Sequence, residues 1–78
     1  MKYYAFREML QYGEEFEIVY KDKTYWLSQR TALHKLFFTK SPDDYLIFGS
    51  VEEVLSAKLL DGKILEEIYF FRNLSIDK

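Results

Sequence analysis

The stretch YLIFGSVEEVLSAKLLDGKILEEIYFF, residues 45–71, carries the clearest structural signals in this chain. A short apolar run is followed by Ser50-Val51-Glu52-Glu53, which has the S-x-x-E pattern of a helix capping box. In that motif the Ser50 hydroxyl accepts a hydrogen bond from the Glu53 amide, and the Glu53 carboxylate accepts one from the Ser50 amide. We therefore predict a strand over Tyr45–Phe48 and a helix that begins directly after Ser50.

Two amphipathic segments follow this helix start. Asp61-Gly62 lies between them and predicts a turn, because glycine adopts turn conformations that other residues avoid. We predict two short C-terminal helices, and we expect the tail Ser75–Lys78 to fray, as chain ends often do. The apolar stripes recur at helical spacing and contain Val51, Val54, Leu55 and Leu59 in the first segment, and Leu65, Ile68 and Tyr69 in the second.

The N-terminal half begins with a helical pattern and continues with strand patterns. Apolar residues recur at helical spacing over residues 3–12, and Gly13 fits the position just after a helix end. Phe16, Ile18 and Tyr20 then alternate with polar or exposed positions, which is typical of a half-buried strand.

More strands follow in the middle of the chain. Asp22-Lys23 is placed as a hairpin turn before the strand-forming segment TYWLSQ, residues 24–29. Leu33–Thr39 is predicted as a third strand, although the segment Thr31–Leu33 is also compatible with a helical turn. The segment Lys40–Asp44 contains Ser, Pro and two Asp residues and predicts a turn.

These elements predict one α+β domain over residues 1–78. It has a short N-terminal helix, a three- or four-stranded antiparallel sheet, and two short C-terminal helices packed on one face. A chain of this length has a small core, and its 49% hydrophobic content, with seven Tyr, seven Phe and one Trp, supplies the apolar area that such a core needs.

Composition also limits the class of protein. Cysteine is absent, so disulfides and thiolate metal sites are excluded, and a reducing cytoplasm suits the chain. The N-terminal segment MKYYAFREML lacks the apolar core and cleavage site of a secretory signal, and no stretch is long and apolar enough to span a membrane. We expect a cytoplasmic protein that does not contact membranes.

The segment FGSVEEVLSAKLLDGKILEEIYFF resembles the C-terminal half of small, mostly unannotated α+β proteins from Gram-positive bacteria and their phages. The resemblance implies a similar fold and a phage or prophage setting, and it implies no catalytic residue. Two positions depart from the family pattern: Ile64 stands where Ser or Thr is usual, and Tyr69 lies near a usual Trp. The matching positions are Ser50, Glu52, Glu53, Leu55, Asp61, Gly62, Lys63, Leu65, Glu67 and Ile68.

Candidate catalytic groups are few. His34 is the only histidine, and no acidic residue lies near it in sequence to form a catalytic or metal-binding set. Four pairs of adjacent carboxylates fit solvated surfaces, turns or helix starts, and there is no glycine-rich phosphate loop. We expect no enzymatic activity, no metal, no cofactor and no small-molecule substrate.

The strongest indication of binding lies in residues 21–40. The segment contains five basic residues and one acidic residue, Asp22, so its net charge is +4. Aromatic residues lie between the basic ones. If Tyr25 points into the core, strand alternation turns Trp26 outward, and an outward Trp needs a cover: the terminal helix, a second subunit or a partner. Core packing alone remains an alternative. The candidate contact residues are Tyr25, Trp26, Arg30, His34, Lys35, Phe37 and Phe38.

Three functional hypotheses follow from these patterns. The preferred one is a non-enzymatic protein-interaction module that binds or inhibits a host protein, with Trp26 as its main anchor. The second is a weak single-stranded nucleic-acid binder, in which basic residues contact phosphates and aromatic residues stack on bases. The third is a structural homodimer.

Overall fold

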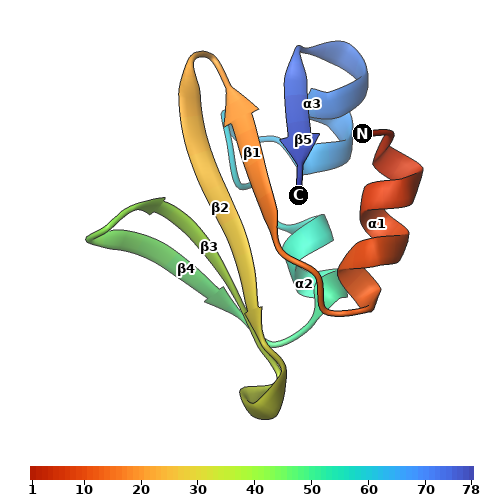
Figure 1. The fold of residues 1–78 in the computed structure, drawn as a ribbon. Coiled ribbons are helices and arrows are strands. Elements are labelled where there is room, and N and C mark those ends of the chain that lie inside the picture. Colours follow the sequence, from red (N-terminus) through yellow and green to blue (C-terminus); the bar gives the residue numbers. More distant parts are fainter.

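The computed structural model describes all residues 1–78 and shows a five-stranded antiparallel sheet with three helices (Figure 1). The strands lie side by side in the order β4-β3-β2-β1-β5, so the first four form a meander and the last one returns to lie beside β1. The strands are β1 (Phe16–Tyr20), β2 (Lys23–Arg30), β3 (Lys35–Ser41), β4 (Asp44–Phe48) and β5 (Leu74–Asp77).

The fifth strand corrects the prediction of a three- or four-stranded sheet with a frayed tail. Leu74 and Ile76 of β5 are almost fully buried, and Ile76 pairs with Ile18 of β1. Four residues are too few to form a strand in isolation. Apolar and polar residues alternate over only these four positions, and so short a pattern does not distinguish a strand from an unstructured tail. Pairing with β1 provides the hydrogen bonds that hold this strand.

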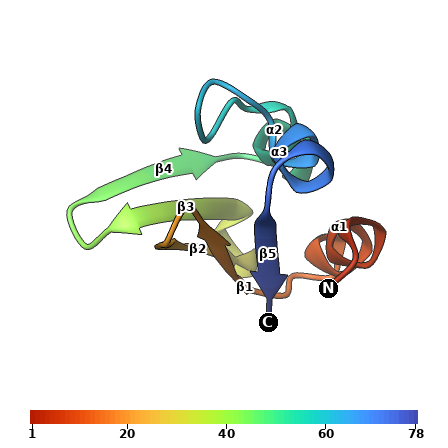
Figure 2. The ribbon, with the colours of Figure 1, turned by 90° about the horizontal axis from the view of Figure 1, so that it is seen from above.

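All three helices lie on the same side of the sheet in both views (Figures 1 and 2). They are α1 (Tyr3–Gln11), α2 (Val51–Ser56) and α3 (Leu65–Phe71). The predicted N-terminal helix and the two short helices near the C-terminus are therefore confirmed. Gly13 has a φ of 87° and directly follows the C-cap residue of α1, which is the position predicted for it.

The core lies between the helices and the inner face of the sheet. Across the sheet, Phe16, Leu27 and Phe38 form one inward row, and each is at most 3% exposed. Phe6 of α1 packs edge-on against Phe16, with the two ring centroids 4.8 Å apart. All sixteen buried residues are apolar, so this small domain is held by one continuous hydrophobic cluster.

Two connections differ from the prediction by one or two residues. The β1–β2 turn is made by Lys21 and Asp22, both at positive φ, one residue earlier than predicted. A single 3-10 turn, η1 (Thr31–Leu33), precedes β3, so the helical alternative for this segment is confirmed and the strand begins at Lys35. His34 joins the two with a left-handed φ of 54°.

Candidate partner-binding surface

The outer face of the sheet, opposite the helices, carries a row of residues that crosses all five strands. The pairing register places Trp26 next to Thr39 and Thr39 next to Tyr45. On the other side of Trp26 lie Glu17 and then Asp77. Residues directly opposite each other in a sheet share a face, so this row has aromatic side chains at its β2 and β4 positions and carboxylates at its β1 and β5 positions.

The next row adds two apolar side chains to this face. Phe37 of β3 lies between Ser28 and Ile47, and its ring is 6.2 Å from the ring of Tyr45. The side chains of Trp26, Tyr45 and Ile47 are each about half exposed, at 47%, 52% and 51%. We call Trp26, Phe37, Tyr45 and Ile47 the outer aromatic patch.

Two predicted contact residues lie on the opposite face and are withdrawn from the candidate site. Phe38 is fully buried in the core, and Tyr25 stacks on it with ring centroids 5.6 Å apart and planes 13° apart. Strand alternation explains the difference, because Tyr25 pairs with the buried Ile18 while its neighbour Trp26 points outward. The predicted set of contact residues combines side chains from both faces of the sheet.

Three predicted basic residues come together at one end of this surface. Arg30 and Lys35 are a cross-strand pair on the outer face, and His34 in the connection between them is exposed. All three line a shallow depression of about 280 Å³ beside the η1 turn. We call Arg30, His34 and Lys35 the basic end of the outer face.

The remaining basic residues of the middle segment lie elsewhere. Lys21 and Lys23 are at the opposite end of β2, an eight-residue strand about 26 Å long, and Lys40 lies near the end of β3. The Lys21 ammonium is 2.8 Å from the Asp61 carboxylate. That hydrogen bond raises the pKa of Lys21 and, together with a hydrogen bond from Tyr20, lowers the pKa of Asp61. The net charge of +4 in the sequence is therefore divided in space.

Sequence reasoning missed two members of the outer aromatic patch. Tyr45 and Ile47 were placed in a short apolar strand, and an apolar run of this kind also fits a strand buried on both faces. In the structure β4 is an edge strand, and Tyr45, Leu46 and Ile47 are all exposed. The signal that distinguishes the two cases is the position of the strand in the sheet, which depends on topology.

A polar cluster at Asp61 was also not predicted. The Asp61 carboxylate accepts a hydrogen bond from the Tyr20 hydroxyl at 2.8 Å, and it lies 3.6 Å from the Arg72 guanidinium. The Arg72 guanidinium donates a hydrogen bond to the Tyr20 hydroxyl, which raises the pKa of Arg72 above its usual value. These contacts join the Asp61-Gly62 turn to the β1–β2 turn and to the end of α3, so the cluster has a structural role.

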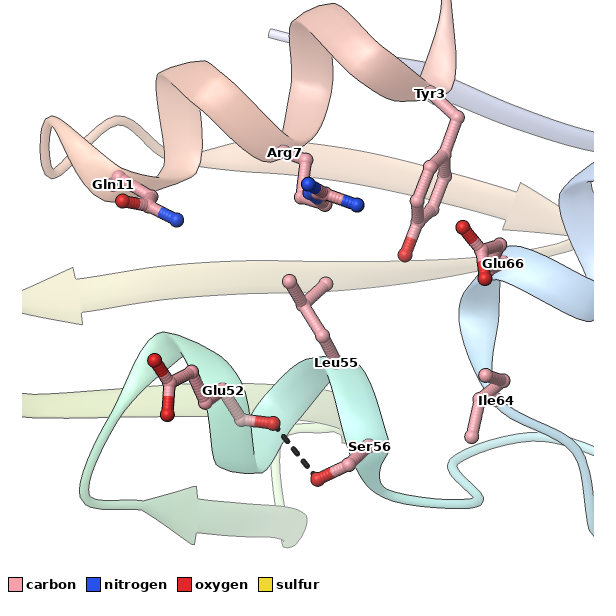
Figure 3. A pocket seen from close by; sticks show the side chains of 8 residues that line it. All are labelled: Tyr3, Arg7, Gln11, Glu52, Leu55, Ser56, Ile64 and Glu66. Atoms are coloured by element: carbon pink, nitrogen blue, oxygen red, sulfur yellow. Dashed lines mark hydrogen bonds between the residues drawn. The ribbon is translucent and has the colours of Figure 1, made fainter.

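A groove of about 400 Å³ separates the helices (Figure 3). Burial raises the pKa of Tyr3 in this groove to about 12, and the nearby Glu66 carboxylate adds to the effect. The hydroxyl of Ser56 donates to the backbone carbonyl of Glu52 at 2.8 Å, a bond within α2. The groove is lined by Tyr3, Arg7, Gln11, Glu52, Leu55, Ser56, Ile64 and Glu66.

Two further properties concern the whole chain. No three His, Cys, Asp or Glu side chains are arranged to hold a metal ion. None of the three helices has the length and apolar character needed to cross a membrane.

Comparison of the chain with protein-family models, curated proteins and solved structures found no significant match.

Proposed function

We propose that this chain is a protein-interaction module that binds a partner protein with the outer aromatic patch. The observation that carries the proposal is the half-exposed Trp26, which lies among Phe37, Tyr45 and Ile47 on a face without helices. Aromatic side chains are enriched where proteins bind each other, and Trp and Tyr are frequent energetic hot spots. Exposed apolar clusters of this kind on a small domain often mark an interaction site.

The surroundings of the patch suggest how a partner would be oriented. Glu17 and Asp77 lie on its β1–β5 side, and Arg30 and Lys35 lie at its basic end. Such a polar rim contributes little affinity, but it selects a partner whose charges are opposite in sign and orients that partner. The mechanism is occupation of a surface, with the apolar side chains desolvated at the centre.

The same surface favours protein over single-stranded nucleic acid. A nucleic-acid groove needs a continuous track of cations along the phosphates. Here Lys21 is paired with Asp61, and it is separated from the basic end by the length of β2. Binding to the outer face should accordingly respond only weakly to salt, whereas nucleic-acid binding falls steeply as salt is added.

The biological setting of this proposal rests on the family resemblance in residues 48–71. Proteins of that kind occur in Gram-positive bacteria and their phages, so we propose a host protein as the partner and inhibition by steric occupation as the outcome. The proposal includes no catalytic step and no cofactor.

The test is capture of a partner by immobilised protein from a Gram-positive bacterial lysate. Wild-type protein is compared with Trp26→Ala and Phe37→Ala, and bound proteins are quantified by mass spectrometry. We expect both variants to lose the same captured protein by at least about tenfold, since a hot-spot truncation costs about 2 kcal/mol or more. Tyr4→Ala is the matched control, because Tyr4 is an exposed aromatic residue on α1, at 72%.

Two outcomes would overturn the proposal. One is a captured protein that all four chains retain equally. The other is a circular-dichroism melting curve in which Trp26→Ala unfolds at room temperature, because Trp26 would then be needed for folding and not for binding.

A further inference from the structure

Strand β4 forms a free edge of the sheet that carries apolar side chains on both faces. Tyr45 and Ile47 point to the outer face, and Leu46, opposite the buried Phe38, points to the inner face and is still 40% exposed. Asp44 is the only charged residue in the strand. Natural sheets usually protect an edge with Lys, Pro or a covering segment, because unpaired backbone groups on an apolar edge recruit another strand.

The other edge of the sheet is different. Strand β5 has only four residues, its apolar side chains are buried, and it ends with Asp77 followed by Lys78, which forms an ion pair with Glu14. Short length and terminal charges protect this edge in the usual way. Residues Tyr45–Phe48 of β4 lack such protection.

We propose that β4 pairs with β4 of a second copy of this chain, antiparallel and around a two-fold axis at Leu46. This register pairs all five residues of the strand, with Leu46 opposite Leu46 and Asp44 opposite Phe48 of the second copy. Tyr45 then lies opposite Ile47 of the second copy, and an aromatic side chain beside a β-branched one is a favourable cross-strand pair. The two-fold axis makes this pair twice.

The charges on the β3–β4 hairpin do not oppose this arrangement. Antiparallel pairing places the tip of one hairpin, with Lys40, Asp43 and Asp44, beside the base of the other. Asp44 then lies opposite Phe48 on the inner side, whereas Lys35 and Arg30 lie on the outer face of β3 and β2. The two Asp44 residues are about 13 Å apart along the strands, so this register brings no like charges directly opposite each other.

The dimer would also change the outer face. Because every pair in this register joins residues of the same face, the two outer aromatic patches form one continuous surface on a ten-stranded sheet. The inference is independent of the proposed partner: Trp26 lies on β2, two strands away from the new contact, so Trp26→Ala should abolish capture without changing self-association.

The first experiment measures mass by sedimentation equilibrium from about 1 to about 500 µM, a range in which a modest interface changes from mostly monomer to mostly dimer. We expect a monomer–dimer equilibrium whose dissociation constant rises at least about tenfold in Leu46→Lys, because two like charges would lie directly opposite each other. Tyr12→Lys is the control, since Tyr12 is 80% exposed and distant from β4 at the end of α1.

The second experiment tests the register by disulfide formation, which the chain permits because it has no cysteine. Directly opposite residues on antiparallel strands have Cα atoms about 4.5–5.5 Å apart, which is within disulfide range. We expect Leu46→Cys to form a covalent dimer on mild oxidation, and a mixture of Tyr45→Cys with Ile47→Cys to form the mixed dimer. Tyr12→Cys should remain monomeric under the same conditions.

Three results would overturn the proposal. They are a monomer at every concentration, a dimer whose dissociation constant Leu46→Lys leaves unchanged, and cross-linking of Tyr12→Cys as fast as that of Leu46→Cys. A dimer in which another register cross-links would also contradict the two-fold axis at Leu46. If β4 pairs with a strand from another protein and not with a second copy, the pure protein will remain a monomer at every concentration.

Discussion

Asp61 lies in a turn with a left-handed φ of 52°, and its side chain connects three separate segments. Its carboxylate accepts hydrogen bonds from Tyr20 and Lys21 and lies near Arg72. The charged side chains of Lys21, Asp61 and Arg72 are exposed, so water and salt screen their charges, and the contribution of each ion pair to stability is small. The cluster contributes mainly by fixing the position of the Asp61-Gly62 turn.

The first prediction at this scale is a pH dependence. Hydrogen bonds from Lys21 and Tyr20 lower the pKa of Asp61 in the folded state. Its contribution is therefore complete above the unfolded-state pKa of about 3.9 and is lost as the pH falls through the lower folded-state pKa. We expect the stability difference between wild type and Asp61→Asn to be constant from neutral pH to about pH 5 and to shrink below about pH 4.

Urea midpoints measured between these pH values provide the check. Asparagine tolerates the left-handed backbone, so the substitution isolates the charge. Asp22→Asn is the matched control, because Asp22 also has a positive φ and lies outside this cluster. A difference that persists unchanged at acid pH would show that the carboxylate charge has no part in it.

At the scale of single elements, helix α2 shows how a local signal operates in the folded chain. The Ser50 hydroxyl accepts from the Glu53 amide at 3.2 Å, as the capping box predicts. The Glu53 carboxylate accepts from the Gly49 amide at 2.8 Å, one residue earlier than the motif places it. In α3, the Glu67 carboxylate accepts a hydrogen bond from the Ile64 amide. The Ile64 side chain has no oxygen that could accept one from the Glu67 amide, so only half of a capping box is present.

The prediction for α2 follows from its cap. Removing the hydroxyl in Ser50→Ala leaves a helix amide without its partner and should lower the free energy of unfolding by about 1 kcal/mol. Ser50→Asn, which keeps an acceptor at the N-cap, should remain within a few tenths of a kcal/mol of wild type. Urea denaturation of the three chains measures both values. Equal losses in the two variants would mean that the hydroxyl does not cap α2.

At the scale of the whole molecule, two neighbouring aromatic residues have opposite environments. Phe37 lies in the outer aromatic patch, whereas Phe38 pairs with Leu27 across the sheet and is fully buried in the core. A domain of this size is stable by only about 4–12 kcal/mol. Truncation of a buried Phe costs about 3–5 kcal/mol, so one core residue accounts for much of the margin.

We therefore expect Phe38→Ala to be largely or partly unfolded at room temperature and Phe37→Ala to remain folded. Phe38→Leu keeps most of the side-chain volume and should cost about 1–1.5 kcal/mol, which provides a measurable value if Phe38→Ala cannot be purified. Circular dichroism and urea denaturation measure the three variants. Similar losses for Phe37→Ala and Phe38→Ala would contradict the assignment of the two faces.

Local patterns predicted most elements because their causes are local. The helical spacing in residues 3–12, the alternation of Phe16, Ile18 and Tyr20, and the cap at Ser50 depend only on neighbouring residues. Strand β5 was missed because its burial pattern covers only four residues and its hydrogen-bond partner, β1, is more than fifty residues away in sequence.

The candidate site depended more strongly on the fold. The sequence by itself determined that Trp26 and Tyr25 face opposite sides of a strand, because side chains alternate along an extended backbone. Only the tertiary structure decided which side the helices cover, and hence that Trp26 and Phe37 are outside while Tyr25 and Phe38 are inside. It also decided that β4 is an edge, which exposes Tyr45 and Ile47, because strand order is a long-range property that no local pattern encodes.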